Sequence, residues 1–248
     1  MEKIYEIDVT DALYVSMTGS ERTTVLLLAH ATNELNVLQR LIMQMDTGPI
    51  SKHQAINDAE TGMLFTIVRL LIGKIFETWN LLSTRVLQNE EISKKYLPLL
   101  NQVETNALQE LKKEFGKRNL LSKLRNNFSF HFPSNAEIDN SLNSLERNSK
   151  LSFFVSETQG NCFYAGAELV ILEGMKNQYL PHHFSEIAHD TITTSRNLGD
   201  VLGGLIGQIL QSHIDIKAKH SELFPVADTS NINEAKISYF FDTSSKRP

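Results

Sequence analysis

The sequence of 248 residues contains a single cysteine, Cys162. One thiol can neither close an internal disulfide nor supply a cysteine-rich zinc site, so both kinds of cross-linked fold are excluded. The lack of a disulfide framework fits a reducing compartment. Because the first residues carry no basic region followed by an apolar core, no secretory signal is expected, and a cytoplasmic location is predicted.

Long apolar runs are also missing. The longest candidates, 25–29 and 201–210, fall short of the roughly 18 residues that span a bilayer, so no membrane association is expected. No glycine-rich phosphate loop follows an expected strand, and no Gly-x-Ser-x-Gly elbow occurs, so nothing indicates a nucleotide-dependent enzyme and no cofactor is predicted. The net charge of -5 argues against nucleic-acid binding over the whole surface, but leaves room for a local basic patch.

What the sequence does contain is helical periodicity. Apolar residues recur at intervals of three and four along 28–42, which predicts an amphipathic helix over about 20–45 with Ser20 as its N-cap. Residues 54–88 are apolar over most of a helix circumference, as is typical of a central, buried helix. The predicted fold class is therefore mostly α, an antiparallel helical bundle with a small C-terminal β-hairpin.

Shorter elements follow the two long helices. Helices are predicted over about 90–100, 102–115, 119–126, 135–147 (with Ser134 as N-cap) and 183–214, and a β-hairpin is predicted from 151–155 and 162–164. Residues 165–176 fit a strand or a helix. The last helix contains Gly199, Gly203, Gly204 and Gly207, and because glycine weakens helices, this spacing indicates close backbone approach to a neighbouring helix or subunit.

These elements group into four parts of the chain. Residues 1–19 form an N-terminal arm or short strand, and 20–148 form the helical bundle. Residues 149–216 supply the hairpin and the glycine-rich helix, which pack on the bundle. Residues 217–248 read as a polar tail in which 237–241 docks locally.

Three charged residues interrupt the apolar helix faces. Lys74 and Glu77 lie three residues apart, so they either form an ion pair on the surface or line a polar pocket. Glu34 raises the same question in the first long helix. A buried Glu34 would need a partner such as Lys74 or Arg125, because an unpaired buried carboxylate is costly, and the alternative is an exposed Glu34.

The start of the last long helix offers residues that could bind a metal ion. His183, Glu186 and Asp190 could share one helical face there. A metal site needs a complete set of ligands, and no further ligand is evident. The sequence therefore predicts no metal.

A basic segment precedes the most informative motif. Between Glu110 and Arg125, six basic and two acidic residues give a local net charge of +4. Such a segment is either a solvated helix face or a surface that faces phosphate groups. In the second case the RNA backbone would be held by Lys117, Arg118 and Lys123.

The motif itself joins an arginine and a histidine. Arg125 and His131 are separated by five residues, and Asn126 follows the arginine. This run resembles the Arg-x(4–6)-His motif of HEPN domains. The resemblance implies an all-α bundle, commonly a homodimer in which motif residues of two subunits line one cleft. Many HEPN proteins are metal-independent ribonucleases of toxin–antitoxin and antiphage systems, whose partners include antitoxins or other regulatory proteins, while others have no known cleavage activity.

The chemistry of these side chains fits that activity. A histidine moves protons near neutral pH, and a bidentate guanidinium stabilises charge that develops on a phosphate. Arg125 would stabilise the phosphate, His131 would transfer protons and Asn126 would orient the site. The alternative is a non-catalytic helical protein-interaction module in which Arg125 and His131 are structural.

Overall fold

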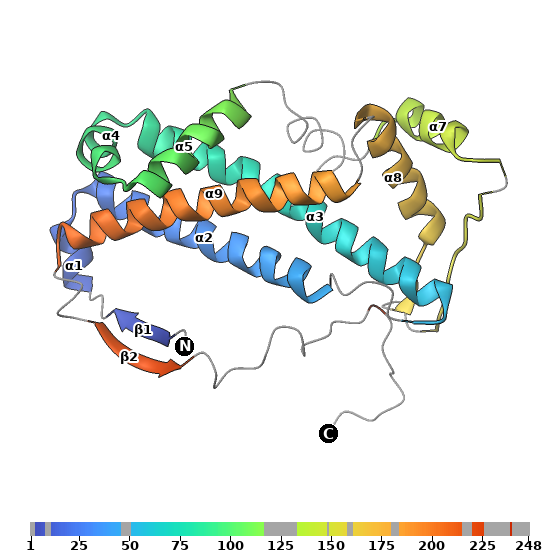
Figure 1. Ribbon diagram of the computed structural model, residues 1–248, viewed down its shortest axis with the longest axis horizontal. Coiled ribbons are helices and arrows are strands. Elements are labelled where there is room, and N and C mark those ends of the chain that lie inside the picture. Colours follow the sequence, from blue (N-terminus) through green and yellow to red (C-terminus); the bar gives the residue numbers. More distant parts are fainter. Residues whose placement is uncertain are drawn as a thin grey trace. The chain divides into compact units, whose positions relative to one another are not determined.

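The computed structural model describes residues 3–7, 11–45, 51–116, 133–147, 149–157, 161–179, 184–214, 220–225 and 239. This part of the chain is mostly helical, which confirms the predicted fold class at that level (Figure 1). No helix in it is long and apolar enough to cross a membrane. The finer prediction, a HEPN-like antiparallel bundle, stays a proposal.

The two long helices predicted in the first third of the chain are confirmed. The structure has α1 (Asp11–Ser16), α2 (Gly19–Met45) and α3 (Gln54–Leu82), which continues into a π-helical turn (Ser83–Leu87). Ile72, Ile75 and Leu82 of α3 are fully buried. The nearly continuous apolar surface of this helix therefore marks it as central, as predicted.

The N-cap of α2 differs from the prediction. The cap is Thr18, not Ser20: the Thr18 hydroxyl accepts from the Glu21 amide at 3.2 Å, and the Thr18 amide donates to the Glu21 carboxylate at 3.0 Å. This reciprocal pair is a capping box, which satisfies two backbone amides at once. Ser20 lies inside the first turn, where its hydroxyl accepts from the Asn89 side chain at 2.6 Å.

The shorter helices also follow their local signals. They are α4 (Glu90–Tyr96) with a 3-10 turn (Leu97–Leu99), α5 (Gln102–Phe115) and α7 (Asn135–Ser144). Asn101 with Glu104 caps α5, and Ser134 with Glu137 caps α7, each as a capping box. The predicted helix over 119–126 lies outside the described residues.

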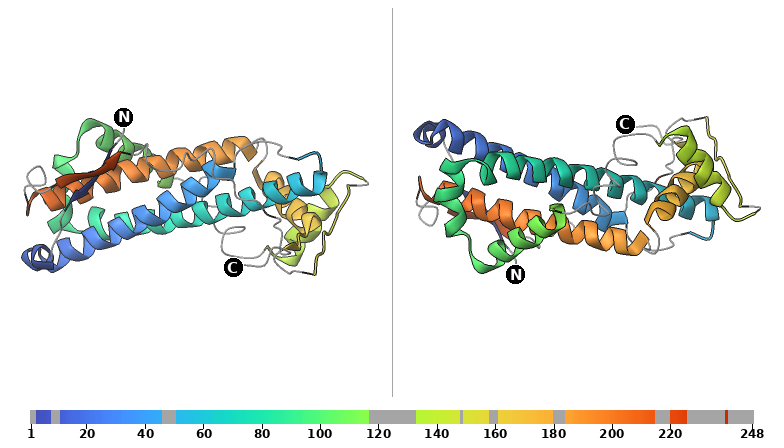
Figure 2. Two further views of the ribbon diagram at one scale, coloured as in Figure 1. Left: turned by 90° about the horizontal axis from the view of Figure 1, so that it is seen from below. Right: turned by 90° about the horizontal axis from the view of Figure 1, so that it is seen from above.

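The remaining helices are α8 (Ala165–Tyr179), which resolves the ambiguous segment as helical, and α9 (Phe184–Gln211). Figures 1 and 2 show α5 against α9, and there the Glu104 carboxylate fills the space that a Cβ atom would occupy on Gly204. A neighbouring helix therefore comes close to this glycine, but with a side chain and not with the backbone that the spacing predicts. At Gly199, Gly203 and Gly207 such a Cβ would meet no described atom within 4 Å apart from its chain neighbours and the backbone of its own helix.

The predicted hairpin of 151–155 and 162–164 is wrong. The two segments share one antiparallel bridge, in which Phe154 and Phe163 exchange hydrogen bonds of 2.7 and 2.8 Å. No ladder extends from it, because α8 begins at Ala165, two residues after the bridge. The described strands lie elsewhere: β1 (Lys3–Ile7), within the predicted arm, pairs antiparallel with β2 (His220–Pro225), within the predicted polar tail.

The chain divides into two compact units that alternate along the sequence. Unit 1 comprises 1–37, 74–117 and 192–235, and unit 2 comprises 38–73, 118–191 and 236–248. Each unit has its own buried residues: Leu28, Leu35 and Leu202 in unit 1, and Phe65, Ile72 and Met175 in unit 2. Each of the long helices α2, α3 and α9 contributes residues to both units. The four parts predicted from the sequence are instead continuous stretches of the chain.

Candidate functional sites

The predicted catalytic and RNA-binding residues all lie outside the described part of the chain: Arg125, Asn126, His131, Lys117, Arg118 and Lys123. In the sequence, the segment that contains them joins the end of α5 to the start of α7. Their assignment stays a prediction.

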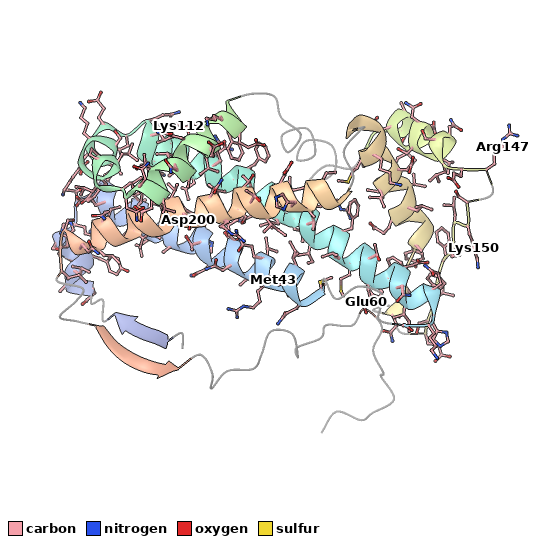
Figure 3. All side chains as sticks on the ribbon, in the orientation of Figure 1. Met43, Glu60, Lys112, Arg147, Lys150 and Asp200 are labelled. Carbon is pink, nitrogen blue, oxygen red and sulfur yellow. The ribbon has the colours of Figure 1, made fainter. Side chains whose placement is uncertain are left out.

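The start of the basic segment is described, at the end of α5. Lys112 and Lys113 are exposed there, and the Lys113 amine lies 2.6 Å from the Glu110 carboxylate. The labelled Lys112 side chain lies on the outer side of α5 in Figure 3. At this end the basic segment is exposed, as both the solvated helix face and the phosphate-facing surface require.

The three residues predicted as an ion pair or a pocket are described in unit 1. The Lys74 amine lies 2.7 Å from the Glu34 carboxylate, and His30 Nε2 lies 3.4 Å from the same oxygen. Glu34 and Lys74 are half-buried, and Glu77 is exposed. Lys74 is thus the partner that a partly buried Glu34 requires, and the pair joins α2 to α3.

A second carboxylate, which the sequence did not single out, is far more deeply buried. Glu21 in the first turn of α2 is 1% exposed. Its Oε1 atom accepts hydrogen bonds from the Lys95 amine at 2.7 Å and from the Tyr96 hydroxyl at 2.5 Å. Its Oε2 atom accepts from the Thr18 amide at 3.0 Å and lies 3.1 Å from His213 Nε2. We call these five residues the Glu21 cluster.

The contacts in the Glu21 cluster determine the charge of the carboxylate. Burial alone would raise the pKa of Glu21, because a low-dielectric environment disfavours the charged form. Hydrogen bonds from Lys95, Tyr96 and the Thr18 backbone, together with the charge of Lys95, outweigh burial and lower the pKa from 4.5 to about 2. The contacts of Lys95 with Glu21 and Tyr96 raise the pKa of Lys95. Glu21 is therefore an ionised, fully partnered carboxylate.

Ser16, beside the Glu21 cluster, forms a serine–histidine–carboxylate chain with His213 and Glu21. Ser16 Oγ lies 3.4 Å from His213 Nδ1, and the other ring nitrogen faces Glu21. A nucleophilic serine would direct its proton to the histidine, but Ser16 donates to the Leu13 carbonyl at 2.7 Å. The arrangement thus connects the end of α1 to the start of α2, to α4 and to the residues after α9. Its geometry is that of contacts that stabilise the fold, not of a serine activated as a nucleophile.

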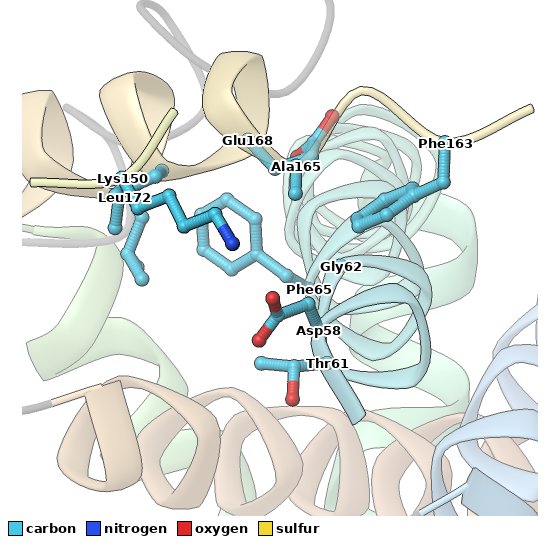
Figure 4. Close-up of a pocket in the computed structure, with 10 residues that line it drawn as sticks. Asp58, Thr61, Gly62, Phe65, Lys150, Phe163, Ala165, Glu168 and Leu172 are labelled. Carbon is cyan, nitrogen blue, oxygen red and sulfur yellow. The ribbon is translucent and has the colours of Figure 1, made fainter. Parts of the chain in front are cut away.

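Unit 2 contains a cavity of about 260 Å³ between α3 and α8. Its walls are largely apolar and its rim carries three charged residues; the lining consists of Asp58, Thr61, Gly62, Phe65, Lys150, Phe163, Ala165, Glu168, Leu169 and Leu172. In Figure 4 the Lys150 amine and the Asp58 carboxylate extend into the space in front of the Phe65 ring. A small ligand with an apolar body and a polar end would match this lining.

A cationic side chain supports one wall of this cavity. The Arg69 guanidinium lies 4.9 Å from the centre of the Phe65 ring and 3.3 Å from the Glu168 carboxylate. Burial lowers the pKa of Arg69, and the charge of Glu168 opposes that effect. The ion pair holds Glu168 and the cation–π contact holds Phe65 in place, so both side chains serve to build the cavity wall.

The predicted local docking of 237–241 is confirmed at Tyr239, the one residue of that range that the structure describes. Its hydroxyl donates to the Cys162 carbonyl at 2.7 Å, and its amide donates to Glu60 at 2.9 Å. Its ring lies 5.0 Å from the Phe163 ring, centre to centre. Tyr239 thereby covers the Phe163 wall of the cavity.

Metal ligation finds no support in the described residues, among which no three histidine, cysteine, aspartate or glutamate side chains gather. His183, from the metal alternative, lies outside them. The chain matches no protein-family model, no curated protein and no solved structure.

Proposed function

We propose that the chain is an RNA-binding helical protein that cleaves RNA without a metal ion, as an endoribonuclease of the toxin or antiphage-defence type. The observation that carries the proposal is the run from Arg125 and Asn126 to His131 at the end of a segment of net charge +4. A mostly helical chain, with a helix on each side of this segment, is the setting in which the motif occurs in HEPN domains.

The proposed reaction uses the RNA's own 2′-hydroxyl as the nucleophile. The 2′-oxygen forms a bond to the adjacent phosphorus, and the bond from phosphorus to the 5′-oxygen breaks, which leaves a 2′,3′-cyclic phosphate and a free 5′-hydroxyl. His131 would transfer the proton, and Arg125 would stabilise the charge on the phosphoryl oxygens. Asn126 would orient the site, while Lys117, Arg118 and Lys123 would hold the backbone.

A second candidate function is a non-catalytic interaction module in which Arg125 and His131 are structural. The observation that favours it is an exposed apolar surface formed by Leu151, Phe153 and Val155 in unit 2. The two candidates differ in one respect that can be measured directly. Only the ribonuclease has an activity that substitutions at the motif can remove.

The test is an RNA cleavage assay in the presence of EDTA with a panel of RNAs. We expect wild-type protein to cleave, and His131→Ala and Arg125→Ala to lose about 100-fold or more in rate, the usual contribution of a proton-transfer group. His189→Ala is the matched control, because His189 is an exposed histidine of α9, and it should cleave like wild type. The variants are compared only if their melting temperatures agree.

Two results would contradict the ribonuclease proposal. One is the absence of cleavage by wild-type protein on every RNA of the panel, which would favour the interaction module. The other is cleavage that persists in His131→Ala and, in a parallel assay, occurs only when EDTA is left out, which would indicate a metal-dependent activity.

A further inference from the structure

Among the described residues, the segment 149–157 in unit 2 has backbone hydrogen-bond partners along one side only. Phe154 exchanges two backbone hydrogen bonds with Phe163, and the Ser152 carbonyl accepts from the Gly166 amide at 3.0 Å. The Ser156 amide donates to Cys162 Sγ at 3.3 Å, and the thiol donates back to the Ser156 carbonyl at 3.4 Å. The even-numbered residues of the segment therefore direct their backbone groups toward residues 162–166.

The three odd-numbered residues in the middle of the segment make no such contacts. Leu151, Phe153 and Val155 form no hydrogen bond with any described residue. In an extended strand, consecutive residues direct their backbone groups to opposite edges. The amides and carbonyls of these three residues consequently form a second edge, which we call the open edge.

The side chains of the open edge are apolar and exposed. Leu151 is 41% exposed, Phe153 64% and Val155 76%, whereas Ser152 and Phe154 between them are half-buried. The ring of Tyr164, itself exposed, meets the Phe153 ring edge-on with centres 5.4 Å apart. Single exposed apolar side chains are ordinary, but a run of them beside backbone groups that have no partner among the described residues is the pattern of a strand-pairing site.

We propose that the open edge pairs antiparallel with the open edge of a second copy of this chain. The edge needs a partner that is extended and has apolar residues at alternate positions, and the segment itself meets both requirements. In one register Phe153 lies opposite Phe153 of the second copy, and Leu151 lies opposite Val155 at either end. All three pairs are then apolar, and the interface has the two-fold symmetry of a homodimer.

The neighbouring registers fit less well. A shift of two residues in one direction places Leu151 opposite Glu157, and a shift in the other places Val155 opposite Ser149. In the preferred register Lys150 lies opposite Ser156 and Glu157 lies opposite Ser149, so no like charges meet. Because the paired segment is short, the dimer is of the weak, concentration-dependent kind, with a smaller buried area than a permanent interface has.

The proposal is tested by sedimentation equilibrium of the full chain over about three decades of concentration. The average mass of wild-type protein should rise from that of the monomer toward twice that value. Phe153→Lys and Val155→Lys should each weaken the dimer by about tenfold or more, because a charged side chain on an edge opposes pairing. Leu142→Lys is the control, since Leu142 is an exposed apolar residue of α7 in the same unit, and it should dimerise like wild type.

Val155 is the most exposed of the three residues, so its substitution has little effect on folding, and equal melting temperatures confirm this for each variant. A wild-type protein that remains monomeric at every concentration would overturn the proposal. So would a dimer of unchanged strength in both lysine variants, because that dimer would form through another surface. A protein that is always monomeric would also lack the two-subunit cleft that the HEPN resemblance implies, whereas a dimer that forms through another surface would not. Cleavage is measured separately from the dimer, so the two proposals can still be told apart.

Discussion

In unit 1 both oxygens of the Glu21 carboxylate have partners within the chain, whereas in unit 2 the backbone groups of the open edge have none among the described residues. The first arrangement places a charge in the interior and compensates for it with four polar contacts. The second leaves donors and acceptors at the surface beside exposed apolar side chains. Internally satisfied groups stabilise a fold, while groups left at an edge are available to a partner.

The largest expected effect comes from removing the buried carboxylate. Glu21→Ala deprives Tyr96 and Lys95 of their acceptor, and we expect the free energy of unfolding to fall by about 3 to 4 kcal/mol. Urea denaturation measures this change. Glu90→Ala is the control, because Glu90 pairs with Lys94 at 2.6 Å on the exposed surface of the same unit, and its removal should cost less than about 1 kcal/mol. Equal costs for the two variants would contradict the assigned role of burial.

The second effect is a pH dependence of stability. The folded-state pKa of Glu21 is lowered to about 2 from 4.5, so the folded protein binds this proton less readily than the unfolded chain. The stabilisation is therefore complete above pH 4.5 and is lost as the pH falls toward 2. At about 1.4 kcal/mol for each pKa unit, the loss is about 3 kcal/mol. The difference in unfolding free energy between wild type and Glu21→Gln should shrink over this range, and a constant difference would exclude the lowered pKa.

The smallest expected effect is a difference in stability between alanine substitutions at a packed and at an exposed glycine of α9. An added methyl group at Gly204 would displace the Glu104 carboxylate that caps α5. A methyl group at Gly203 would meet no described atom within 4 Å apart from its chain neighbours and the backbone of α9. We expect Gly204→Ala to lower the free energy of unfolding by about 1 kcal/mol and Gly203→Ala to raise it by about 0.5 to 1 kcal/mol. Thermal denaturation of both variants checks the two signs, and a stabilised Gly204→Ala would show that Glu104 can move without cost.

The sequence predicted most of the described helices because their signals are local. Apolar spacing located α2, α3 and α9, and the polar residue before each helix located α7, where Ser134 is the cap. At α2 the choice of Ser20 missed the pair formed by Thr18 and Glu21, although their spacing of three residues is the usual sign of a capping box.

The Glu21 cluster could not be predicted, because burial of Glu21 depends on residues that are distant in sequence. Lys95, Tyr96 and His213 follow it by 74, 75 and 192 positions. The capping signal shows where the helix begins, but not which side of its first turn is covered.

The hairpin is predicted from two short segments of strand-forming residues on either side of a polar turn, and that composition is a local signal. It says nothing about the number of strands that pair with the segment. That number was set by Ala165, at which α8 begins and the second strand ends. The motif from Arg125 to His131 lies outside the described residues, so its geometry is a prediction for the cleavage assay to test.

The contrast between a satisfied interior and an open edge is tested most directly by amide hydrogen exchange, resolved by residue, at a low and a high protein concentration. At low concentration we expect the amides of Phe153 and Val155 to exchange much faster than that of Phe154, which donates to Phe163 at 2.7 Å. At high concentration the amides of Phe153 and Val155 should become protected, while the helices of the Glu21 cluster remain unchanged. Equal protection of Phe153, Phe154 and Val155 at low concentration would contradict the account, because the edge would then already be paired.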